Sequence, residues 1–122
     1  MGLDITFLRK DKRNKHYKEI GYFRKANFLV PFFFEDYLGG YESEEIHNAY
    51  NKLKDLHKRC EIVLRDRNET ISDDILPTYS IPFGGNTSYN GAYYLKVKEV
   101  KEWLDLILKH WDDCKFMIEV IC

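Results

Sequence analysis

The sequence predicts an α+β fold in which two or three helices pack on a small antiparallel or mixed sheet. Apolar and polar residues alternate near both ends, over 3–8 and 115–122, as in half-buried strands. Between them, apolar residues recur every three or four positions over 44–65 and 96–111, as on one helix face. The 122 residues suffice for a single domain, 1–122, and are few for two.

The first element is a predicted strand over 3–8, with a second over 17–23 that would complete a hairpin. The stretch from Arg9 to Lys18, which connects them, carries six cations against one acid, Asp11. Such a run contacts a nucleic-acid backbone or an acidic protein surface in some proteins, and in others is a solvated hairpin tip. Both interpretations stay open.

The next segment, 24–38, is dominated by phenylalanine and ends at Gly39-Gly40, a pair typical of helix termination. We expect a buried helix here, with a strand as the competing prediction. Pro31 lies inside the segment and lacks a backbone N–H, so a kink or break is expected over 27–30.

The clearest helix is predicted over 44–65, with Ser43 as its N-cap and Glu44 and Glu45 placed favourably against the helix dipole. A long loop follows over 66–92, polar in its first half and rich in aromatic residues and glycine in its second. We expect the second half to lie across the domain surface. Tyr93, Tyr94 and Leu95 suggest a short strand before the helix over 96–111.

The composition limits the function classes. Nineteen Lys and Arg balance twenty Asp and Glu, for a formal net charge of −1, which argues against direct nucleic-acid binding by overall charge. The three cysteines form no C-x-x-C pair, which argues against a disulfide scaffold and favours a reducing cytoplasm. No run of about 18 apolar residues predicts a membrane span.

Catalytic and metal-binding signals are weak. The four histidines make no H-x-x-x-H or H-E-x-x-H pair, and no dinucleotide fingerprint or G-x-S-x-G elbow occurs. His57 and Cys60 share a helix face at i, i+3, but a Cys-His nucleophile also needs a cleft and an orienting group. We therefore predict no catalytic residues, no metal ligands, no cofactor and no enzymatic activity.

Two segments predict a site for a ligand or a partner. Cations and an amide near the predicted helix start suit a phosphate or carboxylate, and a glycine-rich loop with tyrosines suits close backbone approach and stacking. The candidate residues are Arg24, Lys25, Asn27, Gly84, Gly85, Asn86, Thr87, Tyr89 and Tyr93. Alternatively, Arg24 pairs with Glu35 or Asp36, Asn27 caps the helix, and the tyrosines pack a thin domain.

Three motifs carry a family resemblance: the opening Met1-Gly2-Leu3-Asp4, the segment Gly21-Tyr22-Phe23-Arg24-Lys25-Ala26-Asn27, and Leu76-Pro77-Thr78 leading to Gly84-Gly85-Asn86-Thr87-Ser88-Tyr89. Together they resemble a family of small phage and prophage proteins. The chain departs from that pattern at Pro31-Phe32-Phe33. The resemblance implies a viral accessory protein, and its shared polar set would be Arg24, Lys25, Asn27, Gly84, Thr87 and Tyr89.

These observations lead to one functional expectation with alternatives. We expect a bacteriophage protein in the host cytoplasm that counters a host defence system by binding, as an anti-CRISPR-like inhibitor of a nuclease or effector. A second hypothesis is a sponge that sequesters a nucleotide second messenger between Arg24, Lys25 and the loop over 84–89. A third is a structural homo-oligomer of the virion, joined through a helical face.

Overall fold

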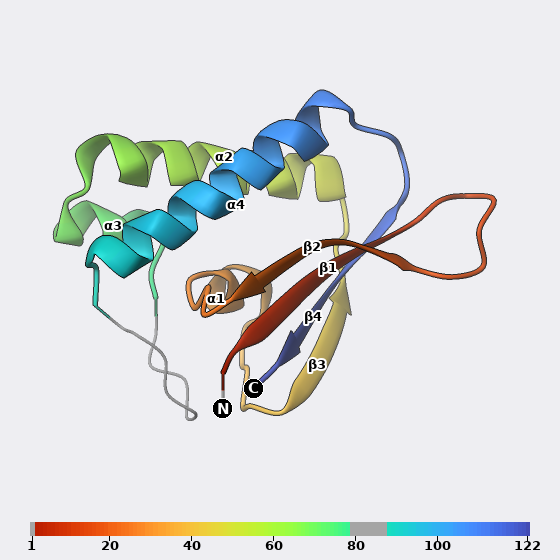
Figure 1. Cartoon of the computed structure of the whole chain (residues 1–122), viewed down its shortest axis with the longest axis horizontal. Coiled ribbons are helices and arrows are strands. Elements are labelled where there is room, and N and C mark those ends of the chain that lie inside the picture. Colours follow the sequence, from red (N-terminus) through yellow and green to blue (C-terminus); the bar gives the residue numbers. More distant parts are fainter. Residues whose placement is uncertain (1, 79–87) are drawn as a thin grey trace.

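The computed structural model describes residues 2–78 and 88–122 and confirms the predicted α+β class (Figure 1). Four antiparallel strands form one sheet, and the described helices lie on one side of it. In chain order the elements are β1 (Asp4–Lys10), β2 (Lys18–Arg24), α1 (Leu29–Phe33), β3 (Tyr41–Glu45), α2 (Ala49–Asp66), α3 (Glu69–Ile75), α4 (Gly91–Lys109) and β4 (Lys115–Ile121).

The sheet has the order β2-β1-β4-β3, so its two central strands come from opposite ends of the chain. Ile5 pairs with Phe23 on one side and Val120 on the other, and all three side chains are buried. This register gathers the apolar positions of three strands on one face, which the helices cover.

The opposite face of the sheet carries exposed side chains among the described residues. Tyr22, Tyr41 and Ile121 point to this side and are 49%, 59% and 51% exposed. Polar residues stand between them, where Thr6 pairs with both Tyr22 and Glu119. The protein is therefore a two-layer structure with one sheet face open.

Helix α4 lies over the inner face of the sheet (Figure 1). Trp103 fixes its position there. Its ring packs 4.6 Å from that of Phe7, and its indole N–H donates to the Ile20 carbonyl at 2.8 Å. Gly21 makes the approach sterically feasible, because a Cβ at this position would lie 2.7 Å from the Trp103 ring.

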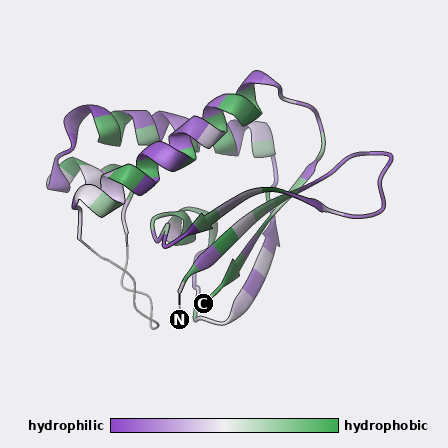
Figure 2. Cartoon of the chain, in the orientation of Figure 1, coloured by the Kyte–Doolittle hydropathy of each residue, from purple (hydrophilic) through white to green (hydrophobic). Residues whose placement is uncertain are grey.

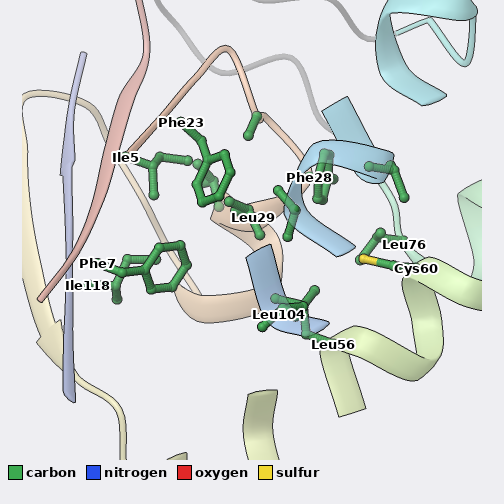
Figure 3. Close-up of a cluster of buried hydrophobic side chains, with 14 of the residues drawn as sticks. Ile5, Phe7, Phe23, Phe28, Leu29, Leu56, Cys60, Leu76, Leu104 and Ile118 are labelled. Carbon is green, nitrogen blue, oxygen red and sulfur yellow. The ribbon is translucent and has the colours of Figure 1, made fainter. Parts of the chain in front are cut away.

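A continuous hydrophobic core joins the two layers. Leu56 and Cys60 of α2 and Leu104 of α4 lie in one cluster with Phe7 and Ile118 of the sheet (Figure 3). All five are at most 1% exposed. Hydrophilic residues lie mainly on the outer helix faces and on the β1–β2 connection (Figure 2). None of the described helices combines the length and the apolar character that crossing a bilayer requires.

The predicted helix over 24–38 is too long. Only Leu29–Phe33 is helical, and Arg24 is the last residue of β2. Pro31 is tolerated because it lies in the first turn, where its missing N–H has no partner within the helix. Gly39 and Gly40 have φ of 104° and 76° and turn the chain into β3 instead of terminating a helix.

The predicted N-cap at Ser43 is wrong. Ser43, Glu44 and Glu45 belong to β3, an edge strand that pairs with β4. Helix α2 starts only at Ala49, so the prediction of its start was five residues early. All five residues of β3 are exposed, and such a strand needs no apolar alternation.

The predicted loop over 66–92 contains ordered helix. Asn68 caps α3 by accepting from the N–H groups of Thr70 and Ile71, and Asn90 caps α4 in the same way. Tyr93, Tyr94 and Leu95 are therefore helical, and the predicted strand there is wrong. The predicted strands over 3–8, 17–23 and 115–122 are confirmed with small shifts of their ends.

Candidate ligand-binding cavity

A cavity of about 520 Å³ lies between the corner that follows β2 and the first turns of α4. Arg24, Lys25 and Lys96 contribute cations to its described lining, which contains no carboxylate. The other lining residues are Asn27, Phe28, Thr78, Ala92, Tyr93 and Leu95. The sequence-predicted residues Arg24, Lys25, Asn27 and Tyr93 thus meet in one place.

The corner between β2 and α1 is tightly held. Lys25 has a φ of 58°, a left-handed conformation that residues with a Cβ rarely adopt. Its N–H donates to the Leu3 carbonyl at 2.8 Å, and the Ala26 carbonyl accepts from Leu29 at 3.0 Å. These bonds redirect the chain out of the sheet, so that Lys25 and Asn27 both line the cavity.

Asn27 is the most unusual residue of the site. Its side chain is buried, with 3% of the residue exposed, yet neither Oδ1 nor Nδ2 has a hydrogen-bond partner within 2–78 and 88–122. The alternative that Asn27 caps a helix is wrong, because the N-cap of α1 is Phe28 and no side-chain capping bond forms. A buried amide without partners is uncommon in folded proteins and calls for an explanation.

The three cations differ in how their charge is compensated. Nε of Arg24 lies 3.5 Å from the Asp4 carboxylate, so its partner is neither Glu35 nor Asp36. Lys96 pairs with Glu99 at 2.9 Å. Lys25 forms no ion pair with any described residue. The cavity therefore has a net positive lining and one uncompensated ammonium group.

The start of α4 adds to this positive character. Ala92 lines the cavity in the first turn of a 19-residue helix. The N-terminal end of a helix carries a partial positive charge of about half an elementary unit. Its first free N–H groups are partly used, because the Asn90 side chain accepts from Ala92 and Tyr93. The helix therefore contributes to the cavity mainly the positive end of its dipole, and to a lesser extent free N–H donors.

The tyrosines of the site are held by the protein. The Tyr93 hydroxyl donates to the Leu76 carbonyl at 2.7 Å, and burial raises the pKa of this phenol. The Tyr89 hydroxyl donates to Asp73 at 2.5 Å, and its ring packs on that of Tyr93 at 4.9 Å. Tyr93 belongs to the described lining of the cavity, whereas Tyr89 does not and packs against the Tyr93 ring.

The remaining predicted site residues, Gly84, Gly85, Asn86 and Thr87, lie outside the described residues. The sequence prediction missed five of the described lining residues, of which Thr78 and Lys96 are polar and Phe28, Ala92 and Leu95 are apolar. Lys96 follows Tyr93 by three positions, which places both on one helix face, but this signal required the helical assignment of 91–95. Thr78 is the last residue of the Leu-Pro-Thr motif, and only the fold brings it to the cavity.

The His57–Cys60 pair forms no activated nucleophile. Cys60 is fully buried, and this burial raises the pKa of its thiol to about 12. His57 faces carboxylates instead, with Nε2 2.5 Å from Asp105 and Nδ1 3.2 Å from Glu61. The imidazole therefore joins α2 to α4, and the thiol remains protonated in the core.

A second cluster lies between the β1–β2 hairpin and the start of β4. Donor atoms of Asp11, Asp112 and Cys114 all lie within 4.8 Å of one another. The Cys114 thiol donates to Asp11 at 3.1 Å, and burial together with this hydrogen bond raises its pKa to about 11. In this structure the cluster forms a hydrogen-bonded contact between the hairpin and the segment that precedes β4.

The basic stretch from Arg9 to Lys18 is the tip of the β1–β2 hairpin, with flanking strand residues. Arg9 pairs with Asp11 at 3.3 Å, while Lys12, Arg13 and Lys15 are exposed. Figure 2 shows this tip as hydrophilic and extended away from the helices. These cations lie at the opposite end of β2 from the cavity (Figure 1).

Comparison with protein-family models, with curated protein sequences and with solved structures gives no match for this chain. The resemblance to small phage proteins therefore stays a prediction.

Proposed function

We propose that the chain is a non-enzymatic binding protein that captures a small anionic ligand in the cavity beside Lys25. The observation that carries the proposal is the positive charge of the lining. Three cations and no carboxylate of the described chain line a space of about 520 Å³. This volume falls within the range of about 300–1,000 Å³ that is usual for small-molecule sites.

The chemistry of the lining supports binding more than conversion. Guanidinium and ammonium groups form charge-assisted hydrogen bonds with phosphate or carboxylate oxygens. Phe28 and Tyr93 supply apolar surface for an uncharged part of the ligand. The described lining includes no histidine, thiol or carboxyl group, the side chains that most often transfer protons in catalysis.

The biological setting follows from the sequence resemblance and belongs to the same proposal. A phage accessory protein in the host cytoplasm would counter a defence system by lowering the free concentration of its nucleotide signal. The cavity favours the sequestration hypothesis over the docking of an effector, because its lining includes Arg24 and Lys25, two of the residues that this hypothesis names.

Docking onto a host nuclease or effector remains the second candidate, and the open sheet face favours it. Tyr22 and Tyr41 are exposed there, and aromatic residues are enriched in protein interfaces. This candidate predicts that one host protein co-purifies with the chain and is lost with Tyr22→Ser and Tyr41→Ser together. Retention of that protein by the double variant would exclude the sheet face.

Capture is tested by calorimetric titration with pyrophosphate, a compact polyanion. We expect binding to the unaltered chain, weakened at least tenfold by Lys25→Glu and by added salt. The matched control is Lys12→Glu, which makes the same charge change at the exposed hairpin tip. Absence of binding, or an equal loss with Lys12→Glu, would contradict capture in the cavity.

A further inference from the structure

The buried amide of Asn27 restricts the class of ligand further than the cations of the lining do. The residue is 3% exposed and lines the cavity, and both polar atoms of its side chain lack partners in the described part of the chain. Burial removes these atoms from water without replacing its hydrogen bonds, which costs folding free energy. A ligand that pairs with both atoms would restore those bonds.

The two polar atoms restrict the chemistry of that ligand. Nδ2 donates and Oδ1 accepts, and both lie in one plane side by side. A phosphate or a carboxylate offers only acceptors when ionised, so it would leave Oδ1 unpaired. The edge of a nucleobase presents a donor beside an acceptor, and asparagine pairs with adenine in this bidentate way.

The surroundings of Asn27 suit a flat ring with a charged group attached. Phe28 follows it directly in the chain and packs edge to face on Tyr93, with 5.7 Å between ring centroids. Both residues belong to the described lining together with Asn27, and base–aromatic contact is a common way to hold a nucleobase. Lys25 and Lys96 lie in the same lining and supply charge for a phosphate.

We infer that the captured anion is a nucleotide, with its base edge on the Asn27 amide and its phosphate on Lys25 and Lys96. This inference rests on the proposed function and specifies the ligand class for the same cavity. It assigns the amide to recognition of the base and the ammonium groups to affinity for the phosphate.

The first test varies the ligand and uses the unaltered full chain. Calorimetry compares the 5′-monophosphates of adenosine, guanosine, cytidine and uridine with ribose 5-phosphate, which lacks a base. We expect at least one nucleotide to bind ten times more tightly than ribose 5-phosphate. Equal affinity for all five would overturn the inference and leave anion capture intact, whereas no binding by any of them or by pyrophosphate would overturn both.

The second test varies the amide. Asn27→Leu should reduce the affinity of the preferred nucleotide to that of ribose 5-phosphate, while ribose 5-phosphate itself binds as before. Because the amide has no partner to lose, the melting temperature of the free variant should stay the same or rise. An unchanged nucleotide affinity in Asn27→Leu would overturn the assignment.

The matched control is Asn68→Leu, which removes an amide that caps α3 through Thr70 and Ile71. We expect this variant to lower the melting temperature and to leave nucleotide binding unchanged. If Asn27→Leu lowered the melting temperature as much as Asn68→Leu does, the Asn27 amide would be paired within the protein, and the inference would be overturned.

Discussion

Tyr93 connects the candidate cavity with the protein interior through the two ends of one side chain. Its ring contacts Phe28 at the cavity, and its hydroxyl donates to the Leu76 carbonyl at 2.7 Å. The residue is only 6% exposed, so the hydrogen bond is shielded from water. Tyr93 therefore serves the site mainly as a fixed wall.

Removing this hydroxyl tests that role. Tyr93→Phe leaves the Leu76 carbonyl without its described side-chain donor, and we expect a loss of about 1–3 kcal/mol in the free energy of unfolding. Urea denaturation measures it, and pyrophosphate affinity should change less than threefold because the ring remains. Tyr41→Phe, at an exposed position, is the control with an expected change below about 0.5 kcal/mol. Equal stability of Tyr93→Phe and the unaltered chain would refute this role.

At the residue scale, the sequence predicted part of the site because local motifs hold chemically related residues together. Arg24, Lys25 and Asn27 occupy one corner and reach the cavity as a group. The ion-pair partner of Arg24 could not be predicted from spacing, because Asp4 lies opposite it only through the register of β1 with β2. The lack of a partner for Asn27 depends on packing from several elements and leaves no trace in the sequence.

The helical layer depends on a polar contact as well as on its apolar core. His57 of α2 lies 2.5 Å from Asp105 of α4, and Lys101 reaches the same carboxylate at 3.1 Å. Burial alone would raise the pKa of Asp105, but the hydrogen bonds from His57 and Lys101 outweigh it and lower the pKa. Glu61 also faces His57, at 3.2 Å.

The sign of this shift predicts how stability changes with pH. A carboxyl group with a lowered pKa stabilises the fold above its unfolded value, near 3.8, and that contribution is lost as the pH falls through the folded value. Asp105→Asn should therefore reduce the melting temperature at pH 6 and make little difference at pH 2. Circular dichroism melts across this range measure the effect.

The control for this experiment is Asp74→Asn on α3, whose carboxylate forms no ion pair with the residues described. Its melting temperature should follow that of the unaltered chain at every pH. A difference for Asp105→Asn that persists at pH 2 would show that the side chain acts through packing and not through its charge.

Elements differ in how well their sequences predict them, and β3 shows why. Strands with one buried face keep an apolar alternation, as Phe116, Ile118 and Val120 do in β4. Strand β3 is held by backbone pairing with β4 while all its side chains are exposed. Its sequence, with three glutamates after Tyr41, is compatible with a helix start, so only tertiary pairing identifies it as a strand.

Helix α1 was misjudged for a related reason. The phenylalanine-rich segment is buried from several sides, and a continuous apolar run does not separate a long helix from a short one with extended flanks. The decisive feature is Lys25, whose φ of 58° ends β2 and turns the chain before the helix begins. The hydrogen bond from the Lys25 N–H to the carbonyl of Leu3, the residue before β1, accompanies that conformation.

At the scale of the whole molecule, the fold class was predictable and the strand order was not. Sequence periodicity identifies each strand and helix by itself. The position of β4 between β1 and β3 depends instead on pairing between residues far apart in the sequence. It depends on how the buried faces of β1, β2 and β4 combine under the helices, with β3 added at the edge through backbone pairing. The pairing of β1 with β2 brings Leu3 beside the end of β2, and so builds the corner that supports the cavity.

The molecule has two separate basic regions, which the total number of Lys and Arg residues does not distinguish. One is the lining of the cavity, at the end of β2 where Arg24 lies, and the other is the exposed hairpin tip over 11–17, at its beginning (Figure 1). They differ in charge balance, because the described lining of the cavity contains no carboxylate, whereas Asp11 lies among the cations of the tip and pairs with Arg9. An anion that binds specifically should distinguish them.

Backbone amide mapping by NMR distinguishes the two regions most directly. Pyrophosphate is titrated into the isotope-labelled full chain, and the shift of each amide is followed. Capture in the cavity predicts saturable shifts at Lys25, Asn27, Ala92 and Lys96, with the amides of 11–17 unchanged. Shifts confined to the hairpin, or no saturable shift at the cavity, would contradict the proposed function.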